Sequence, residues 1–352
     1  MLNKSFSVTI SKKIDKYKKT IQVDSDKSIS IRSFLIGAIS HNISKLNNVL
    51  ESEDVNSAIK CLRKLGVKIV KTKPKQYFVY GKGLGSLFAK KNSVLDLGNS
   101  GTLARLLIGI LSTTPNVQVK LQGDKSLNKR NMSKLIKLMN EFGAEFYPKN
   151  KSNLPLTIIS SQMPVGIEYK AGISAQLKSA VILAGLNSYG ITTVTEEKES
   201  RPHTENILAE NSSKIIELKK NKKKQNIIKI FGKGYLDPLK LSISGDPSSA
   251  AFFTALTLLN DNSKLKIRNV GLNPKRIGFY KLLKNHGAKI QFKNLRKNNN
   301  ELIGNIHIKS SKLTPIKASS AYYTSLTDEY PILFIMAALI PGISVFKGIK
   351  DL

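Results

Sequence analysis

The chain has 352 residues, a length that predicts roughly two domains. Hydrophobic residues make up 41% of the chain and charged residues 23%, which provides material for hydrophobic cores and excludes wholesale disorder. The 57 lysines and arginines against 24 acidic residues give a formal net charge of +33. Such a charge favours an anionic partner: nucleic acid, an acidic membrane or a phosphorylated small molecule. The single cysteine, Cys61, excludes an internal disulfide and a cysteine-based zinc site.

The first predicted element, at 27–40, is a helix whose start is polar and whose remainder is almost wholly apolar. Small, polar or acidic residues cap a helix, and the apolar body predicts that the helix is buried. The same pattern returns at 98–111, 174–186, 247–259 and 327–339. The polar openings of these predicted helices, at steps of 73, 74, 73 and 80 residues, are Ser28, Gly101, Ala175, Ser248 and Asp328.

A second predicted helix alternates with the first. At 58–70, 135–147 and 279–292 an amphipathic pattern ends at a glycine, which predicts a helix, a left-handed cap and a following strand. The caps are Gly66, Gly143 and Gly287, and a degenerate copy carries Ser212. One unit of about seventy residues is thus a buried helix, a strand, an amphipathic helix and one or two more strands. The first helix occurs five times and the second four times, so we expect the fifth unit to break off at Leu352.

The apolar stretch at 331–340 is the best membrane candidate in the sequence. It has about half of the ~20 residues that a membrane-spanning helix needs, and Asp328, Glu329 and Pro341 bound it. The start of the chain contains no apolar run long enough for a secretory signal. We therefore expect a buried helix at 331–340, no membrane partner and a cytoplasmic protein.

Lysine outnumbers arginine by 49 to eight. Many lysines lie in Asn/Lys-rich stretches at 218–224 and 293–300, which we predict to be solvated loops. If generic positive positions carry lysine, the few arginines are expected where a planar, two-pronged donor is needed for carboxylate or phosphate.

The polar openings of the buried helices are candidate anion sites, because a helix N-terminus presents unsatisfied N–H donors and the positive end of the helix dipole. At the first opening, Lys27 and Ser28 are followed one turn later by Arg32. At the second, the GNSGT stretch at 98–102 follows a strand, and its backbone is able to cradle phosphate. Each opening also has an ordinary structural interpretation. The first is then a capped helix with solvated cations, and the second is a simple chain reversal.

Four other side chains invite a chemical interpretation. Asp328 and Glu329 stand at the last helix opening, where an acid is either an N-cap or a general base that faces a basic pocket. His203 is one of four histidines without metal-ligand spacing, so we interpret it as a loop residue and expect no metal site. Cys61 lies beside an apolar stripe, which favours a partly buried structural side chain over a nucleophile.

Seven motifs occur in order along essentially the whole chain: DKSISIR, LGNSGTLAR, GDKSLNKRNM, AGISAQLKSA, ESRPHTE, SGDPSSAAFF and LTDEYPIL. Together they resemble the enolpyruvyl transferase superfamily and, within it, the 5-enolpyruvylshikimate-3-phosphate synthase family. The resemblance implies an α/β fold: a two-domain inside-out α/β barrel of βαβαββ repeats, with five of an expected six begun. It implies one domain at 23–240 and a second, C-terminally incomplete, at 1–22 plus 241–352.

The resemblance also implies a reaction. The enolpyruvyl group of phosphoenolpyruvate would be transferred to the 5-hydroxyl of shikimate 3-phosphate with release of phosphate, a step of the shikimate pathway toward chorismate and the aromatic amino acids. It implies a monomer without cofactor, metal or nucleic acid.

The motifs carry the family's site residues onto this sequence. By resemblance, Asp328 accepts the hydroxyl proton, and Lys27 contacts both the target hydroxyl and phosphoenolpyruvate. Shikimate 3-phosphate would further contact Ser28, Arg32, Ser174, Ala175, Gln176 and Arg201. Phosphoenolpyruvate would further contact Asn99, Gly101, Thr102, Arg130 and Gln176.

The sequence departs from the family pattern at two places. Ala175 stands where many relatives have a second serine, which removes one hydroxyl contact to phosphate. After ISVFKGIKDL, relatives continue with Lys-Glu-Ser-Asp-Arg and Asp-His-Arg stretches, which this sequence does not contain. On this observation we expect a missing C-terminal part, and an inactive fragment is one alternative.

Two other functions are alternatives. The sister enzyme that transfers enolpyruvate to UDP-N-acetylglucosamine would show Lys-Asn where this chain has Lys27 and Ser28, and a cysteine in a mobile loop. A basic nucleic-acid binder would interleave aromatic residues with basic ones, whereas the densest lysine runs contain almost none. Binding that weakens steeply with salt would favour the nucleic-acid alternative.

Overall fold

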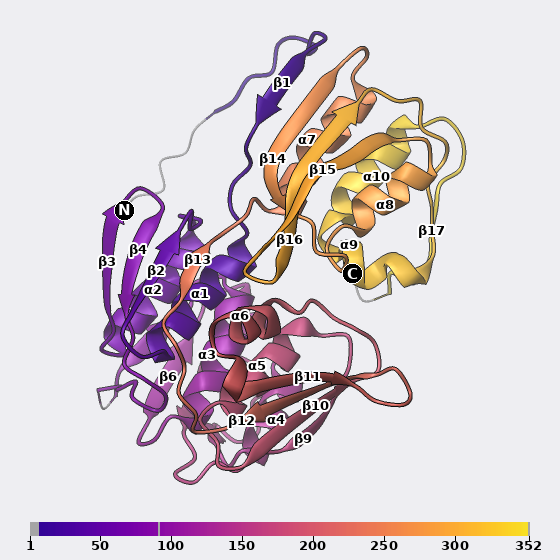
Figure 1. Ribbon diagram of the computed structural model, residues 1–352. Coiled ribbons are helices and arrows are strands. Elements are labelled where there is room, and N and C mark those ends of the chain that lie inside the picture. Colours follow the sequence, from indigo (N-terminus) through magenta and orange to yellow (C-terminus); the bar gives the residue numbers. More distant parts are fainter. Residues whose placement is uncertain (1–6, 91, 351–352) are drawn as a thin grey trace.

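The computed structural model describes residues 7–90 and 92–350 and divides them into two lobes (Figure 1). The core of the first lobe runs from Ile29 to Ile243, and the core of the second runs from Ala250 to Ile340. The domain boundaries predicted near residues 22 and 240 stay a prediction.

The four-stranded sheets of the described residues share one topology: a parallel pair of strands extended by two antiparallel strands. The first sheet of the first lobe has the strand order β13 (Lys240–Ser242), β2 (Ile43–Asn47), β4 (Gln76–Tyr80) and β3 (Lys68–Lys73). The second has the order β5 (Val94–Asp96), β6 (Gln118–Gln122), β8 (Leu156–Ile159) and β7 (Glu145–Tyr147). The third has the order β9 (Glu168–Ala171), β10 (Ile191–Glu196), β12 (Asn226–Phe231) and β11 (Ile216–Lys220). The second lobe holds β1 (Lys18–Ile21), β14 (Lys264–Gly271), β16 (Glu301–Lys309), β15 (Lys289–Asn298) and the pair β17 (Lys317–Ala318) and β18 (Val345–Phe346). This recurrence confirms the predicted repeat.

Two strands are exchanged between the lobes. β1 precedes the first helix of the first lobe, yet it pairs with β14 of the second lobe. β13 precedes the first helix of the second lobe, yet it pairs with β2 of the first. Figure 1 shows indigo β1 beside orange β14, and orange β13 among the indigo strands. The chain therefore crosses between the lobes twice, just after each of these strands.

The helices follow the predicted alternation. The apolar series is α1 (Lys27–Ile39), α3 (Gly101–Thr113), α5 (Ala175–Gly185), α7 (Pro247–Leu259) and α10 (Tyr330–Leu339). The amphipathic series is α2 (Glu53–Lys64), α4 (Ser133–Glu141), α6 (His203–Asn211) and α8 (Gly278–Asn285). Short turns of helix lie at α9 (Tyr323–Leu326) and, as 3₁₀ helices, at Leu127–Lys129, Ser213–Ile215, Ser320–Tyr322 and Thr327–Glu329. Gly66, Gly143 and Gly287 have φ of 86°, 90° and 93°, which confirms the left-handed caps.

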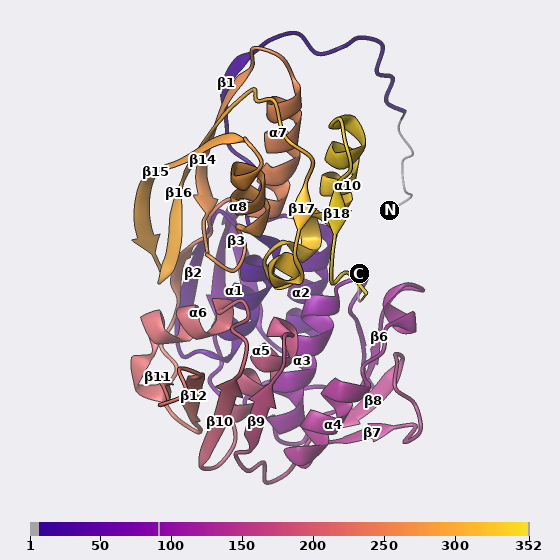
Figure 2. The same ribbon diagram turned by 90° about the vertical axis from the view of Figure 1, so that its right-hand side faces the viewer.

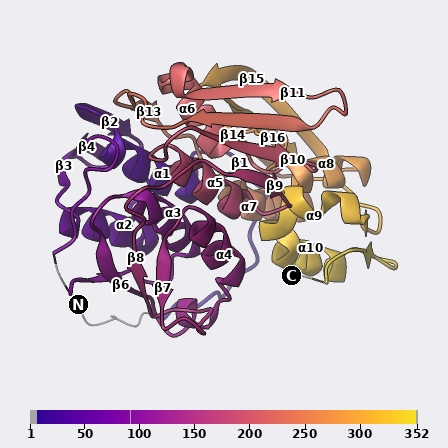
Figure 3. The same ribbon diagram turned by 90° about the horizontal axis from the view of Figure 1, so that it is seen from below.

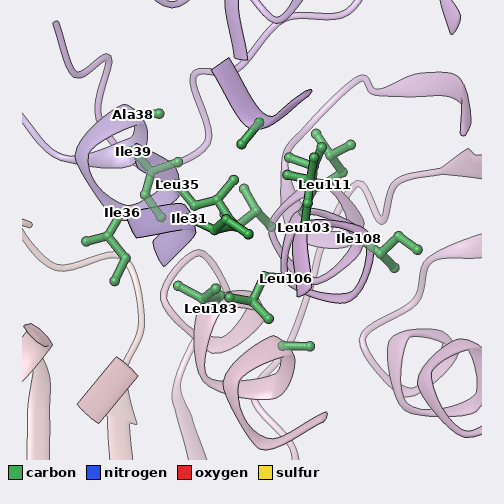
Figure 4. Packing of buried hydrophobic residues seen from close by; sticks show 14 of the residues in the cluster. Ile31, Leu35, Ile36, Ala38, Ile39, Leu103, Leu106, Ile108, Leu111 and Leu183 are labelled. Atoms are coloured by element: carbon green, nitrogen blue, oxygen red, sulfur yellow. The ribbon is translucent and has the colours of Figure 1, made fainter. Parts of the chain in front are cut away.

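The core of the first lobe forms where α1, α3 and α5 meet, with the sheets around them (Figure 3). Figure 4 shows Leu35 of α1, Leu106 of α3 and Leu183 of α5 directed toward one another, and all three are buried. Gly109 permits this packing, because a Cβ there would lie 2.5 Å from the Ala180 carbonyl oxygen. The predicted inside-out arrangement, with helices inside and sheets outside, is thus confirmed.

The second lobe covers its apolar helices less completely. α7 and α10 pack against each other (Figure 2), but Phe252 and Phe253 of α7 and Ile335 and Leu339 of α10 are exposed. The prediction of a buried helix is therefore wrong for one face of each. The physical reason is that, within residues 7–90 and 92–350, no third helix of the apolar series packs on that face, whereas α1, α3 and α5 cover one another.

The prediction of solvated loops in the Lys-rich stretches is also wrong in part. Residues 218–220 belong to β11 and residues 293–298 belong to β15, and each strand lies at the edge of its sheet. Lysines are typical of edge strands because their charge discourages pairing with another chain. Of the helices that the structure describes, none combines the length and the apolar character required to cross a membrane.

Candidate active site

The starts of several apolar helices meet where the two lobes face each other. A cavity of about 190 Å³ lies there, lined by Ser174, Gln176 and Arg201 of the first lobe and by Thr327 and Asp328 of the second. Seven of its twelve lining residues, at 173–176 and 199–201, lie just before or at the starts of α5 and α6, so its wall is built mainly from helix starts.

The start of α1 is capped by a carboxylate. Oδ1 of Asp26 accepts a hydrogen bond from the backbone N–H of Ile29 at 2.8 Å. Lys27 follows, and its Nζ lies 3.0 Å from Oδ2 of Asp54 on α2. The Lys27 side chain is nevertheless 51% exposed, so the ammonium group is accessible to a ligand.

Arg32 lies one turn into α1 and is buried. Its Nε donates to Oγ1 of Thr204 at 2.9 Å, its Nη2 donates to Oγ of Ser179 at 3.1 Å, and its Nη1 donates to Ser28. Burial lowers the pKa of Arg32 to about 10, so the guanidinium stays charged at neutral pH. These contacts, on α1, α5 and α6, hold the cation in place.

The start of α3 holds two guanidinium groups close together. Nη2 of Arg130 donates to Oδ1 of Asn99 at 2.7 Å, and Nη1 of Arg105 donates to the Gly101 carbonyl at 3.1 Å. A Cβ on Gly101 would lie 2.7 Å from Nη1 of Arg130 and 2.9 Å from Nη1 of Arg105. Glycine therefore leaves the room that both arginines occupy.

Sequence reasoning missed Arg105, although the signal was present. Arg105 follows Gly101 by four residues, and Arg32 follows Ser28 by the same interval. Burial, and after it the charge of Arg130, lowers the pKa of Arg105. The two cations therefore repel each other, which favours the binding of an anion between them.

The start of α5 is joined to the start of α3. Oγ of Ser174 caps α5 by accepting from the Leu177 N–H at 3.3 Å, and Ala175 is the first residue of the helix. Nε2 of Gln176 donates to Oγ1 of Thr102 at 2.9 Å. This bond fixes the two helix starts relative to each other.

The second lobe contributes a carboxylate. Oδ2 of Asp328 lies 2.8 Å from Nη2 of Arg201, which precedes α6 in the first lobe. Burial raises the pKa of Asp328, but the charges of Arg201 and Arg276 outweigh burial and hold this pKa below its ordinary value. Asp328 is therefore an anion at neutral pH and is paired across the lobes.

Two other sequence interpretations need correction. His203 is not in a loop: it is the first residue of α6 and is buried, and its Nδ1 lies 2.8 Å from Oε1 of Glu301 on β16. Cys61 is fully rather than partly buried, and burial raises the pKa of its thiol to about 12, which opposes a nucleophilic role. The described residues contain no group of three or more His, Cys, Asp or Glu side chains placed to hold a metal ion.

These positions define what the site is able to do. Five cationic side chains, from α1, α3 and the segments before α4 and α6, lie at or beside helix starts: Lys27, Arg32, Arg105, Arg130 and Arg201. Helix N-termini add further positive potential. The arrangement suits ligands with several negative charges. Two carboxylates, those of Glu199 and Asp328, line the cavity.

The comparisons with known proteins agree with this chemistry. The chain matches the family EPSP synthase (3-phosphoshikimate 1-carboxyvinyltransferase) over residues 11–352. A protein named 3-phosphoshikimate 1-carboxyvinyltransferase from Novosphingobium aromaticivorans is 38% identical over 337 residues, which cover 95% of this chain and 76% of the relative. One of that name from Zymomonas mobilis is 37% identical over 344 residues, which cover 97% of this chain and 75% of the relative.

A solved structure also matches the fold of this chain. The EPSP synthase from Acinetobacter baumannii superimposes with a TM-score of 0.83 at 35% identity, and the match covers 96% of this chain and 76% of that one. The matches cover 95–97% of this chain and 75–76% of these three relatives, and the expectation of a missing C-terminal part stays a prediction. On the family match, the identities and the shared fold, this chain belongs to the EPSP synthase family.

Proposed function

We propose that this chain transfers the enolpyruvyl group of phosphoenolpyruvate to the 5-hydroxyl of shikimate 3-phosphate in the space between the lobes. Membership of the EPSP synthase family supports the reaction. The observation that carries the site assignment is the contact of Arg201 with Asp328 across the lobes, on the wall of a cavity that helix starts enclose. The reaction belongs to the biosynthesis of chorismate and the aromatic amino acids.

Shikimate 3-phosphate would bind to the first lobe. Its phosphate would engage Arg201 and the start of α5, where Ser174, Ala175 and Gln176 line the same cavity. Its carboxylate and ring hydroxyls would reach Ser28 and Arg32 at the start of α1. The buried contacts of Arg32 support this assignment, because a cation that is already held in place loses little freedom when it binds a ligand.

Phosphoenolpyruvate would bind at the start of α3. Arg130 and Arg105 face the same point beside Gly101, and Asn99 positions the fork of Arg130. Thr102 and Gln176 would complete the contacts, and Lys27 would lie between the two substrates. Two multiply charged anions repel each other in water, and this group of fixed cations offsets the repulsion.

Asp328 would be the base. Its carboxylate takes the proton of the 5-hydroxyl as the hydroxyl oxygen bonds to C2 of phosphoenolpyruvate, and the Lys27 ammonium group gives a proton to C3. The Lys27 amine then takes a proton back from C3 as the C2–C3 double bond re-forms and the C2–O bond to phosphate breaks. The departing phosphate takes the proton from Asp328. In the unliganded chain the Arg201 charge weakens Asp328 as a base. A substrate phosphate that engages Arg201 would remove this effect, so binding would activate the base.

The remaining features of the proposal concern the state of the protein. We predict a monomer in the cytoplasm that uses no cofactor and binds no nucleic acid. The exposed lysines of β11 and β15 support a solvated surface, since β11 has no aromatic residue and the one aromatic residue of β15, Phe292, packs against Tyr280.

The test is an assay of the purified chain. Phosphate release should require both shikimate 3-phosphate and phosphoenolpyruvate, and shikimate 3-phosphate should raise the thermal midpoint. UDP-N-acetylglucosamine in place of shikimate 3-phosphate should give no phosphate. A chain that shows neither phosphate release nor thermal protection, or that prefers the UDP-sugar, would contradict the proposal. Binding to an oligonucleotide that falls steeply with salt would favour the nucleic-acid alternative.

A further inference from the structure

The two segments in which the chain crosses between the lobes, just after β1 and just after β13, are hydrogen-bonded to each other. Ser25 and Gly245 form an antiparallel bridge. The Asp26 N–H donates to the Ser244 carbonyl at 2.9 Å, and the Asp246 N–H donates to the Asp24 carbonyl at 2.8 Å. The crossings therefore act as one hinge between the lobes.

Each crossing ends in an aspartate that caps a helix. Asp26 caps α1 of the first lobe through the Ile29 N–H, and Asp246 caps α7 of the second lobe by accepting from the Ser248 N–H at 2.8 Å. Both aspartates are largely buried. Two carboxylates so close together would repel each other without a shared cation.

Arg276 supplies that cation. It lies between β14 and α8 and is buried, with Nη1 at 3.1 Å from Oδ2 of Asp26 and Nη2 at 2.9 Å from Oδ1 of Asp246. Nη2 also donates to Oγ of Ser248 at 2.9 Å. One planar fork thus holds the caps of two helices that belong to different lobes.

The contacts of Arg276 lead directly to the proposed active site. Asp26 is adjacent in sequence to Lys27, which we assign to both substrates. On the other side, Ser248 Oγ donates to Oε1 of Glu329, the neighbour of the proposed base Asp328. The guanidinium is therefore the shared support of the first lobe's substrate-binding helix and of the second lobe's base.

We infer that Arg276 is a positioning residue for the transfer reaction, which sets the start of α1 and the segment of Asp328 in register across the hinge. Its catalytic consequence rests on the proposed function, whereas its structural consequence does not. Sequence reasoning could not find it, because its partner Asp26 lies 250 residues away in the chain.

The test compares Arg276→Lys with Arg63→Lys. Arg63 lies on α2 and donates to the Ile69 carbonyl at 2.8 Å, away from the hinge. Lysine keeps the charge at 276, but one ammonium group does not reproduce the two-pronged contact. Hydrogen exchange, followed by mass spectrometry, should quicken by about fivefold at both helix starts, near Ile29 and near Ser248, as expected for a weakened cap. The control should exchange like the wild type.

Unchanged exchange at either helix start in Arg276→Lys would overturn the inference. If Arg276→Lys does not fold, Asp246→Asn gives a second measurement, because it leaves the contact of Arg276 with Asp26. In Asp246→Asn, hydrogen exchange should be faster near Ser248 and unchanged at the start of α1. An equal increase at both helix starts, or no change near Ser248, would also overturn the inference.

Activity separates positioning from mere stability. In a wild type that releases phosphate, Arg276→Lys should lower kcat by about 10- to 100-fold at a temperature where circular dichroism shows a folded chain, because the base is misplaced. The KM values should change less than kcat does. A kcat within twofold of the wild type would overturn the positioning role. An inactive wild type would contradict the proposed function and leave the exchange test of Arg276 decisive.

Discussion

The two lobes use the same kind of helix and arrive at different degrees of burial. In the first lobe, α1, α3 and α5 cover one another, and Ile36 of α1 is fully buried. In the second lobe, α7 and α10 cover each other on one side, and Ile335 of α10 is 56% exposed. An apolar sequence therefore specifies a helix locally, but its burial depends on which neighbours are there to cover it.

The lobes also differ in what they contribute to the site. The proposed contacts to both substrates come from the first lobe, except for Asp328, which the second lobe supplies. In the proposed function the well-packed lobe forms a platform for substrate binding, and the second lobe carries the base. The predictions below test this division.

The largest effect is expected at the base. Asp328→Asn should lower kcat by about 10³-fold, because general base catalysis contributes on that order. Binding of shikimate 3-phosphate, measured as a thermal shift, should remain, since the first lobe supplies most of its contacts. Asp261→Asn, at an exposed turn, is the matched control. Loss of binding together with kcat in Asp328→Asn would break the division of labour between the lobes.

The same substitution should act differently in the two lobes. Ile36→Ala removes a fully buried side chain from α1 and should lower the free energy of unfolding by about 2–5 kcal/mol. Ile335→Ala, on the exposed face of α10, should change it by about 0.5 kcal/mol or less. Urea unfolding followed by circular dichroism measures both. Equal losses would show that the face of α10 is covered in solution.

A pH effect is expected in the second lobe. Burial raises the pKa of Glu329 to about 7, above its ordinary value near 4.5. Between these two pH values the unfolded chain loses the proton and the folded chain keeps it, so this group lowers stability as pH rises from about 4.5 to about 7. Below a pH of about 4.5 Glu329 does not change the stability, and above a pH of about 7 the loss of stability is complete.

Glu329→Gln removes this titration. The stability of the variant minus that of the wild type should rise by up to about 3 kcal/mol across the same window, measured by urea unfolding at several pH values. Ser248, which donates to Glu329, remains able to donate to the amide oxygen. A difference that stays constant with pH would show that Glu329 is ionised in the folded lobe.

The smallest effect is expected at Gly101 of the first lobe. An added Cβ would meet the flexible ends of Arg130 and Arg105, so both guanidinium groups would shift by a few tenths of an ångström or more. Gly101→Ala should therefore raise the KM for phosphoenolpyruvate by about tenfold and leave the fold intact. Gly172→Ala, where a Cβ meets nothing within 4 Å, is the control. Equal KM values would remove Gly101 from the proposed site.

The sequence predicted what is encoded locally. The starts of α1, α3 and α5 were found because capping residues and apolar periodicity are read within a few residues, and the glycine caps for the same reason. The burial of α7 and α10 was not predictable, since it depends on distant neighbours. The strands at 218–220 and 293–298 were missed because edge strands rich in lysine look like solvated loops.

The candidate site shows the same limit. Motif resemblance supplied Lys27 and Asp328, and their roles stay predictions. Arg276 was missed because it lies in a loop with no pattern of its own, and His203 because its partner Glu301 is 98 residues away. Contacts between residues that lie far apart in the chain leave no local pattern in the sequence, so only the tertiary structure reveals them.

The exchange of β1 and β13 has a consequence for synthesis of the chain. β1 leaves the ribosome early, but its partner β14 follows only after the whole first lobe. The first lobe is able to fold once β13 has appeared, while β1 remains unpaired. The positive charge of Lys18 and Lys19 on β1 discourages pairing with other nascent chains during that time.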